Sequence, residues 1–438
     1  MSRPLKRLLI CLPLAGAFCA RRPALVRGAG YPDINFTGYQ ATPVDNPLGG
    51  RLAAGYAVAY DGGGDILIAG VLADKSGAYH LAVLRLENDG TLDPLFGARG
   101  VAYDPKDPPA WGAAMAMDGG GRILIAGSQG AGFGNSNAVV LRRLLREGNP
   151  DPLFARGGLA RAAGPFGGRA AAYAVAPLGR GALVGGAASG PNGQTWGAVW
   201  RFDDDGELEQ AFGRGGVALF PAPPGYSSQV RALLPQSGGS VLAAGTLDGR
   251  MAIWKLLPGG GLDRSFGRRG VALGPWGQAR ALAAGAGGVL WLGGFVALYN
   301  RVTGAAQKRL PAVAAFSAAG ALDKSFGRGG TEFLAVPNFS NGAQIFALAE
   351  NPQGGLYAAG DAGAAGKQAC FWALDAGGLP ISDFGAGGVM ALPNAAGGVD
   401  DRAYSIAFDG AGRILAAGIS RDKTGAVRLA LWRVLPAR

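Results

Sequence analysis

Histidine is nearly absent from this chain of 438 residues, which contains one, His80. A single histidine excludes metal sites built from several imidazole ligands, and a Ser–His–Asp triad would have to use His80 itself. The nucleophile motif G-x-S-x-G is missing as well. We identify no catalytic residues, we expect no cofactor and no bound metal, and we expect His80 to be solvated.

Cysteine is scarce too. Of the three cysteines, Cys11 and Cys19 fall in an N-terminal leader, so Cys370 has no partner for an intrachain disulfide in the mature protein. It stands beside Phe371 in a predicted strand, where a free cysteine behaves as a small buried hydrophobe.

No apolar run is long enough to predict a membrane-spanning helix in the mature chain. The apolar run 8–19 follows three basic residues. It contains the small-residue cleavage motif 15–17, and cleavage near residues 19 and 20 is an alternative. This pattern is typical of a signal peptide, and the run is too short to cross a bilayer. We predict a signal peptide and short leader over residues 1–27, with the cleavage position left open. The mature protein is then secreted, periplasmic or on the cell surface.

The formal net charge of +11 is concentrated in that leader. Residues 1–27 carry six basic and no acidic residues, which leaves 35 basic against 30 acidic residues, a net of +5. The aromatic residues do not alternate with basic ones as a base-stacking surface requires. We therefore expect no nucleic-acid partner.

Glycine is abundant, with 79 residues, and it takes part in a repeat. The phrase Leu-Asp-x-x-Phe-Gly-x-x-Gly-Val recurs with its phenylalanine every 54 to 60 residues. Such a period indicates one supersecondary unit used repeatedly. The phenylalanines are Phe96, Phe154, Phe212, Phe266, Phe326 and Phe384.

Three further segments recur between these phrases. Each unit opens with an Ala-rich apolar run such as 56–59, continues with Gly-x-Ile-Leu-x-Ala-Gly, and has a third apolar run that usually ends in a basic residue, such as 83–85. Short β-branched and aromatic segments between glycines predict strands. Four strands per unit predict an all-β, seven-bladed β-propeller of four-stranded antiparallel blades. The copies of the second phrase are 66–70, 123–127, 182–186, 241–245, 289–293, 356–360 and 414–418.

The two ends of the chain favour a closed ring over an open β-solenoid. The last unit ends at Val434 without a Phe-Gly phrase, and a degenerate copy stands at Asp33–Gly38, with Phe36 in register 60 residues before Phe96. We expect the N-terminal segment to complete the last blade and close the ring, which would remove an open sheet edge. The interpretation is a single domain over residues 28–438.

The paired phrases resemble those of the delta-60 repeat family. The segments 118–127 and 409–418 match its Asp-Gly-x-Gly-x-Ile-Leu-x-Ala-Gly phrase well, whereas the third unit has Pro177 and Leu178 in place of Asp-Gly. The resemblance implies a bacterial secreted or cell-surface propeller, and it brings no catalytic residues with it.

One acidic run is a possible calcium site. Asp203, Asp204 and Asp205 precede a glycine, and they predict either a solvated turn or a calcium-binding loop. The turn is the favoured interpretation.

Propeller geometry indicates which face binds ligands. The uniform turns lie on one side, and the segments that differ between units lie on the other, where binding residues usually occur. Aromatic residues in or beside these segments are candidate ligand contacts, the alternative being that each covers the end of its own blade. The candidates are Trp111, Trp196, Tyr226, Trp276 and Tyr299.

We therefore predict an exported, non-catalytic propeller that binds a surface glycan or an envelope protein. The alternative is a secreted lyase or glycoside hydrolase on the same frame, which would need two carboxylates facing one cleft. A purely structural spacer is the third hypothesis. The available acids are Asp104, Asp107, Glu332, Asp361, Asp400 and Asp401.

Overall fold

Regular structure in this chain is almost entirely β. Within the described residues, the only helical segments are two 3-10 turns, η1 (Ser237–Gly239) and η2 (Ala286–Gly288). The predicted all-β class is confirmed, and no helix of this part of the chain has the length and apolarity to cross a membrane. The computed structural model describes residues 32, 33, 36, 42–130, 136–299, 306–336, 342–351, 354–363, 366–392 and 399–437.

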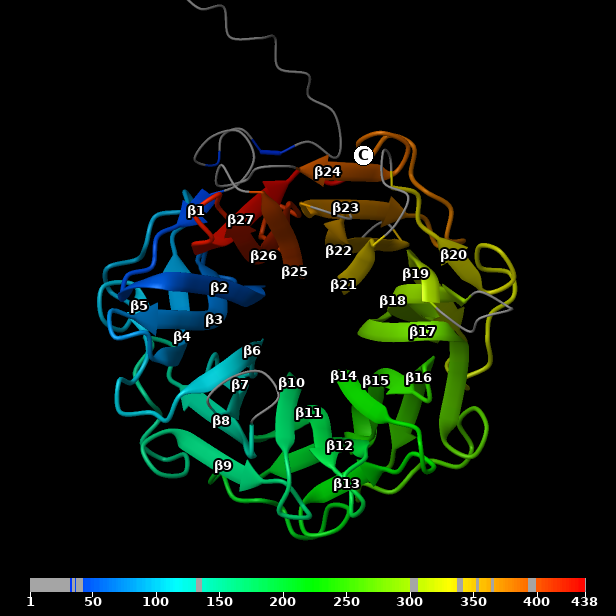
Figure 1. Ribbon diagram of the computed structural model, residues 1–438, viewed down its shortest axis with the longest axis horizontal. Helices are drawn as coiled ribbons and strands as arrows, with labels where there is room; N and C mark the ends of the chain where they lie inside the picture. Colours follow the sequence, from blue (N-terminus) through cyan, green and yellow to red (C-terminus); the bar gives the residue numbers. More distant parts are fainter. Residues whose placement is uncertain are drawn as a thin grey trace, which may run out of the picture.

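Strands that follow one another in sequence pair antiparallel in groups, and Figure 1 shows these groups arranged around a common axis. The first groups are β2 (Gly49–Tyr60), β3 (Ile66–Asp74), β4 (Tyr79–Leu86) and β5 (Val101–Ala102); β6 (Ala110–Met117), β7 (Ile123–Gln129), β8 (Ala138–Leu144) and β9 (Leu159–Ala163); and β10 (Ala170–Leu178), β11 (Gly181–Ser189), β12 (Thr195–Phe202) and β13 (Val217–Phe220).

The long strand β17 (Val271–Ala284) belongs to two groups, because its first part pairs with β16 and its second part with β18. The remaining strands are β14 (Ser228–Pro235), β15 (Val241–Leu247) and β16 (Arg250–Leu256); β18 (Leu290–Tyr299), β19 (Ala306–Phe316) and β20 (Thr331–Phe333); β21 (Gln344–Glu350), β22 (Leu356–Ala362), β23 (Gln368–Leu374) and β24 (Val389–Leu392); and β25 (Asp400–Phe408), β26 (Ile414–Arg421), β27 (Val427–Val434) and β1 (Thr42–Val44).

The second phrase of the repeat forms the second strand of each group. Its copies lie in β3, β7, β11, β15, β18, β22 and β26, as the sequence predicts. The fifth copy needs a correction. Leu290 to Gly294 is the segment in register with the others, because Gly294 and not Gly293 takes the place of the final glycine.

That final glycine accommodates a β-bulge in the innermost strand. In β10 the pairing to β11 skips Tyr173, between Ala172 and Ala174, and the carbonyl oxygen of Ala171 comes so close to Gly186 that an added Cβ would lie 1.8 Å from it. No side chain larger than hydrogen fits at such a distance, so the phrase needs glycine there. The corresponding distances at Gly70, Gly245, Gly294, Gly360 and Gly418 are 2.0, 1.9, 1.9, 2.0 and 1.7 Å.

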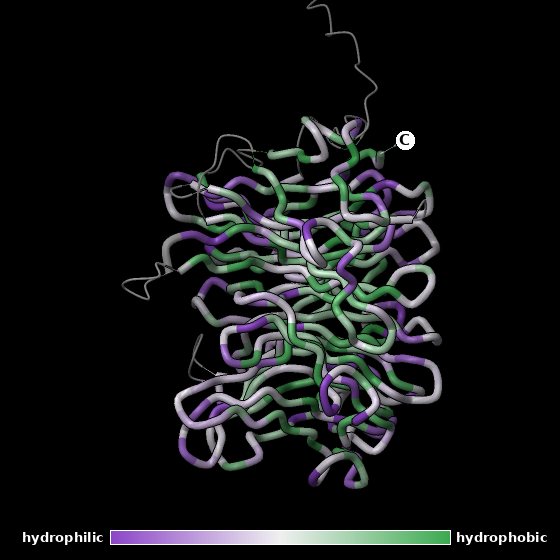
Figure 2. Tube along the Cα trace, turned by 90° about the vertical axis from the view of Figure 1, so that its right-hand side faces the viewer, coloured by the Kyte–Doolittle hydropathy of each residue, from purple (hydrophilic) through white to green (hydrophobic). Residues whose placement is uncertain are grey.

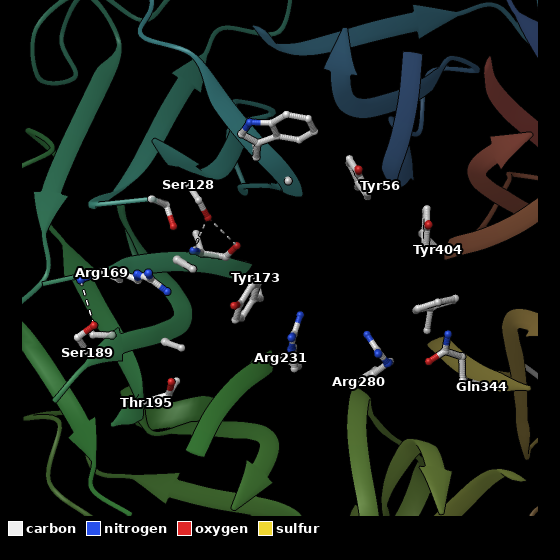
Figure 3. Close-up of a pocket in the computed structure, with 18 of the residues that line it drawn as sticks. Tyr56, Ser128, Arg169, Tyr173, Ser189, Thr195, Arg231, Arg280, Gln344 and Tyr404 are labelled. Atoms are coloured by element: carbon white, nitrogen blue, oxygen red, sulfur yellow. Dashed lines mark hydrogen bonds between the residues drawn. The ribbon is translucent and has the colours of Figure 1, made fainter. Parts of the chain in front are cut away.

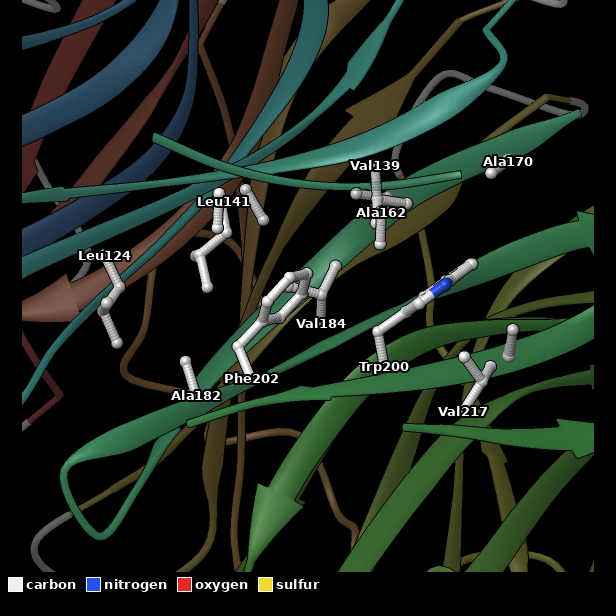
Figure 4. Packing of buried hydrophobic residues seen from close by; sticks show 14 of the residues in the cluster. Leu124, Val139, Leu141, Ala162, Ala170, Ala182, Val184, Trp200, Phe202 and Val217 are labelled. Carbon is white, nitrogen blue, oxygen red and sulfur yellow. The ribbon is translucent and has the colours of Figure 1, made fainter. Parts of the chain in front are cut away.

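The hydrophobic core lies between neighbouring groups of strands. Figure 4 shows one such cluster, in which Leu124 and Leu141 from β7 and β8 pack against Val184 and Trp200 from β11 and β12. Side on, the strand centres are hydrophobic and the turns at both faces are largely hydrophilic (Figure 2). The predicted core tryptophans are at most 2 % exposed, namely Trp200, Trp254, Trp372 and Trp432.

A repeated contact joins the third strand of a group to the Phe-Gly phrase after it. In the first group, Arg85 Nη2 lies 2.6 Å from Asp93 Oδ2, and the guanidinium carbon of Arg85 lies 4.8 Å from the centroid of the Phe96 ring. The acid also accepts the Leu95 amide, as expected for a turn, but its main partner is this arginine. The same sets recur as Arg143–Asp151–Phe154 and Arg201–Glu209–Phe212.

The two ends of the described chain make the same contact with each other. Arg433 Nε of β27 lies 2.9 Å from Asp33 Oδ2, and its guanidinium carbon lies 4.0 Å from the ring centroid of Phe36. The Asp33 amide donates to the Arg433 carbonyl (2.8 Å), and β1 pairs with β27. Phe36 is 3 % exposed and packs in one cluster with Leu429 and Leu431.

The predictions for Cys370 and His80 differ in their outcome. Cys370 is fully buried, as predicted, and burial raises the pKa of its thiol. The prediction that His80 is solvated is wrong. His80 lies in β4 at 5 % exposure, its Nε2 is 3.1 Å from Asp74 Oδ2, and its ring meets that of Tyr103 edge-on.

Replacing Gly245 by alanine should destabilise the protein far more than replacing Gly261. A Cβ at Gly245 would meet the Gln229 carbonyl oxygen at 1.9 Å, whereas at Gly261 it meets nothing within 4 Å. We expect Gly245→Ala to lower the free energy of unfolding by about 3 kcal/mol or more, since β14 must move or lose its bulge. Urea unfolding of both variants measures this, and equal losses would contradict it.

Removing the Asp33 carboxylate should cost more stability than removing that of Glu209. The Asp33 and Arg433 side chains are 6 % and 4 % exposed, whereas those of Glu209 and Arg201 are 35 % and 22 % exposed. Asp33→Ala leaves a buried cation unpaired, with an expected loss of about 3 kcal/mol. Glu209→Ala, the matched control, should lose about 1 kcal/mol or less. Chemical denaturation compares them, and the same loss in both would show that the N-terminal contact does not hold β27.

Candidate functional site

A pocket of about 910 Å³ lies where the innermost strands of the groups meet, and Figure 3 shows part of its wall. The strands β2, β6, β10, β14, β17, β21 and β25 all contribute residues to it. Six of these residues are bulged ones, since the bulge turns a side chain of the inner strand toward the axis. They are Tyr56, Tyr173, Arg231, Arg280, Phe346 and Tyr404.

The second group departs from this rule. In β6 the pairing to β7 skips two residues, between Trp111 and Ala114, and Trp111 and Gly112 line the pocket. The glycine of the second strand, Gly127, has more room, since a Cβ there would lie 2.9 Å from the Gly112 carbonyl oxygen. A tryptophan therefore stands in this group near the level where the other groups place a bulged residue.

The pocket extends onto the face of the variable connections. Its wall includes Ser136, before β8, and Gly193, in the β11–β12 connection, together with Arg169 at the start of β10 and Thr195 at the start of β12. The Arg169 backbone amide donates to the Ser189 hydroxyl oxygen, 3.1 Å away. These segments lie on the face that the sequence predicts for binding.

Aromatic rings form one side of the pocket. Tyr56 and Tyr404 stack with ring centroids 5.4 Å apart, and Phe346 meets Tyr404 edge-on at 4.8 Å. Burial raises the pKa of Tyr56 to about 12, with a smaller contribution from Tyr404, and burial also raises the pKa of Tyr404. Both phenols are neutral at pH 7 and act as hydrogen-bond donors and acceptors.

Arginine side chains form the other side. The guanidinium carbon of Arg231 lies 3.7 Å from the ring centroid of Tyr173, and that of Arg280 lies 5.1 Å from the ring centroid of Phe346. Arg231 donates to the side-chain carbonyl of Gln229 through Nε and Nη2. Figure 3 shows Arg231 and Arg280 side by side, both pointing into the space bordered by Tyr56, Tyr173 and Tyr404.

The candidate acids do not reach this pocket, whose described lining contains no Asp or Glu. Asp361 and Asp400 both lie beside Arg402, with Oδ2 atoms 3.8 Å from Nε and 3.0 Å from Nη2. Asp104 and Asp107 both lie beside Arg142. Glu332 is buried in β20, and Asp401 is buried in β25.

The acidic run 203–205 forms a turn. Asp203 Oδ1 accepts the amides of Asp205 and Glu207, and Asp204 pairs with Arg143 and Arg180. Across the described residues, no group of three or more His, Cys, Asp or Glu side chains is placed to hold a metal ion.

The predicted aromatic contacts are only partly brought together. Trp111 lines the pocket and packs on Tyr79 with ring centroids 4.0 Å apart. Trp196 follows the pocket residue Thr195 in sequence. Its side chain is half-buried and meets the Phe166 ring edge-on. Tyr226 and Trp276 are 51 % and 52 % exposed and lie outside the pocket. Tyr299 ends β18, but its side chain lies outside the described residues.

Sequence reasoning missed the bulged residues, although a signal for them exists. Each stands 13 or 14 residues before the final glycine of the second phrase, as Tyr56 does before Gly70 and Tyr404 before Gly418. Tyr56, Tyr173 and Tyr404 open Ala-rich runs, and a large residue at the head of such a run marks the position. Arg231 and Arg280 occupy the same position with a charged side chain.

Comparison with known proteins supports the fold. The family described as "Domain of unknown function (DUF5122) beta-propeller" matches residues 64–96 and 121–154, which contain β3 with the first Phe-Gly phrase and β7 with the second. No curated protein matches the chain significantly. The chain is an all-β protein with the β-propeller fold, similar to bacterial propeller-repeat proteins.

Solved structures of similar shape include three from different sources. A protein of unknown function from Dyadobacter fermentans is 12% identical, with 91% of this chain and 98% of that chain covered and a TM-score of 0.47. The β-propeller domain of the Trilobed protease from Pyrococcus furiosus is 11% identical, with 90% and 93% covered and a TM-score of 0.40. A Trypanosoma rangeli sialidase is 9% identical, with 90% and 57% covered and a TM-score of 0.40.

The raised pKa of Tyr56 predicts a loss of stability at high pH. The unfolded chain ionises this phenol near pH 10, while the folded protein retains the proton up to about pH 12. The folded state then binds more protons than the unfolded state, so the free energy of unfolding falls as pH rises through this window, by up to about 2 kcal/mol from this residue. Urea unfolding between pH 10 and pH 12 measures the slope.

Tyr56→Phe should reduce that slope, because phenylalanine has no proton to lose. The same substitution at the exposed Tyr226 controls for removal of a hydroxyl elsewhere. A slope in Tyr56→Phe as steep as in the unchanged protein would contradict the assignment of the buried phenol.

Proposed function

We propose that the protein is an exported, seven-bladed β-propeller that works by binding a glycan at the central pocket. Two observations support the ring. The strands pair in groups of four along the chain, and the contact of Arg433 with Asp33 and Phe36 repeats between the chain ends the one that Arg85 makes with Asp93 and Phe96. The N-terminal segment then supplies the outer part of the last blade.

The leader and the cell compartment belong to the same proposal. Residues 1–27 have the pattern of a signal peptide, and they lie outside the described residues. Export to the periplasm, the cell surface or the medium would place a single domain, residues 28–438, where surface glycans are present. The resemblance to the delta-60 repeat family, a group of bacterial secreted and surface proteins, fits this location.

The pocket is the observation that carries the binding function. Its volume of about 910 Å³ falls in the range of small-molecule and oligosaccharide sites, and its wall combines aromatic faces with a few polar groups. Aromatic rings pack against the apolar faces of sugars, while tyrosine hydroxyls, serine hydroxyls and the Gln344 amide can hydrogen-bond their hydroxyl groups. Trp111 supplies the largest such ring in the pocket.

The hydrolase alternative finds less support in this geometry. A glycoside hydrolase needs two carboxylates across the scissile bond, roughly 5 to 10 Å apart. The acid pairs Asp361–Asp400 and Asp104–Asp107 each share an arginine, and none of the four lines the pocket. An envelope protein as partner would instead contact the wider loop face.

The other aromatic candidates would contact only oligosaccharides that are long enough to extend beyond the pocket. Trp196 is next in sequence to the pocket residue Thr195. Tyr226, which precedes β14, and Trp276, in β17, are exposed outside the pocket. We propose that Trp111 contacts every ligand, and that Trp196, Tyr226, Trp276 and Tyr299 contribute only when a chain leaves the pocket across this face.

A glycan array probed with the purified protein tests the proposal, followed by titration calorimetry with the shortest oligosaccharide bound. Trp111→Ala should weaken that binding at least tenfold, about 1.4 kcal/mol, as for a central aromatic anchor. Trp111→Phe should recover part of the affinity. Trp276→Ala, outside the pocket, should change affinity for the short ligand less than about twofold.

Two outcomes would contradict the proposal. Unchanged affinity in a folded Trp111→Ala variant would move the site away from the pocket. Absence of any glycan binding, together with capture of a defined envelope protein that Trp276→Ala weakens, would replace the glycan by a protein partner.

A further inference from the structure

The pocket is electropositive. Arginines 169, 231, 280 and 402 line it, and no carboxylate lines it among the described residues. Arg402 is paired with Asp400 through two hydrogen bonds of 3.1 and 3.0 Å. Arg169, Arg231 and Arg280, in contrast, form no ion pair within the described part of the chain. Arg169 is exposed at the start of β10, whereas Arg231 and Arg280 are half-buried. Two half-buried positive charges thus face the pocket without a carboxylate of the described residues in ion-pair contact.

Arg231 and Arg280 are close enough to repel each other. Burial and, to a smaller extent, the charge of Arg231 lower the pKa of Arg280 to about 10, although the Asp361 carboxylate acts in the opposite direction. Burial also lowers the pKa of Arg231. Arg280 Nε is buried and has no hydrogen-bond partner among the described residues. The pocket thus holds two partly desolvated guanidinium groups.

Their neighbours relieve this cost only in part. The ring of Tyr173 lies under Arg231 and the ring of Phe346 lies near Arg280, and such contacts favour a cation weakly. The hydrogen bonds of Arg231 go to Gln229, a neutral amide. Elsewhere this protein pairs its buried arginines with acids, as Arg143 with Asp151 and Arg433 with Asp33. Arg231 and Arg280 therefore depart from the pattern of these buried arginines.

We infer that the pocket selects anionic ligands, with Arg231 and Arg280 together binding a carboxylate or sulfate group carried by a sugar. This inference rests on the proposed glycan-binding function and assigns it a chemical class. A guanidinium whose face is covered by a ring still has N–H donors along its edge, and two such edges can bind the oxygens of one acidic group. Tyr56, Tyr404 and Trp111 would contact the sugar ring that carries it.

The first arm of the test compares a charged ligand with its neutral twin. Titration calorimetry of the purified protein uses a tetramer of galacturonic acid and the same tetramer with every carboxylate methyl-esterified. The acid form should bind at least tenfold more tightly. Arg231→Gln and Arg280→Gln should each remove most of that difference, while Arg214→Gln, which removes a charge from an exposed turn, should preserve it.

The second arm separates ligand binding from a structural role. Because the two arginines repel each other in the free protein, Arg280→Gln should raise the thermal midpoint without ligand while it weakens binding of the acid tetramer. Arg280→Lys retains the charge but loses the planar donor pair, so it should bind with intermediate affinity. A fall in the midpoint of Arg280→Gln, with unchanged affinity for the acid tetramer, would assign the residue a structural role and overturn the inference.

The third arm tests a sulfated oligosaccharide and inorganic sulfate beside the acid tetramer. Tighter binding of either oligosaccharide than of inorganic sulfate supports a sugar-borne group. Binding of inorganic sulfate as tight as that of both oligosaccharides would overturn the sugar assignment. If acid and ester bind equally and weaken equally in Trp111→Ala, the inference fails while glycan binding stands. If no glycan binds at all, both fail.

Discussion

The architecture of the pocket depends on one close contact, between a carbonyl oxygen of an innermost strand and a glycine of the strand beside it. At Gly186 an added Cβ would lie 1.8 Å from the Ala171 carbonyl oxygen, and at Gly418 1.7 Å from that of Arg402. Only a residue without a side chain permits this approach. The approach in turn accommodates the bulge that directs Tyr173 or Tyr404 toward the axis. A motif that looks like scaffold thus determines which side chains can meet a ligand.

Basic side chains have different partners near the outside of the molecule and at its axis. Toward the outside, a basic residue at the end of the third strand meets an acid and covers a phenylalanine, as Arg143 does with Asp151 and Phe154. These charges are satisfied, and they stabilise the attachment of the Phe-Gly phrase. At the axis, Arg231 and Arg280 lie on aromatic rings, and neither forms an ion pair among the described residues. A buried charge left without a partner lowers stability, and such residues are common where a ligand supplies the missing partner.

Much of the fold could be predicted because its determinants are local and recur. The period of the Phe-Gly phrase, the glycine-bounded apolar runs and the in-register Phe36 predict strands, their order and the contact between the ends. The fifth copy of the second phrase was placed one residue early, because Gly293 and Gly294 are indistinguishable in sequence and only the contact with the Gln278 carbonyl separates them. His80 looked like a solvated residue, since its partners Asp74 and Tyr103 meet it through the pairing of β3 with β4 and the following segment.

The sequence by itself determined the repeat, the strand-rich class, the face that varies between units and the core role of the recurring tryptophans, because each is written in spacing or composition. It placed Trp111 among the candidates but grouped it with Tyr226 and Trp276, which lie outside the pocket. The tertiary structure alone decided which side chains face one another across the axis. Arg231 and Arg280 are far apart from Tyr56 and Tyr404 in the chain. They share a pocket because strands from distant units converge there, and in all of the innermost strands but β6 one bulged residue turns inward.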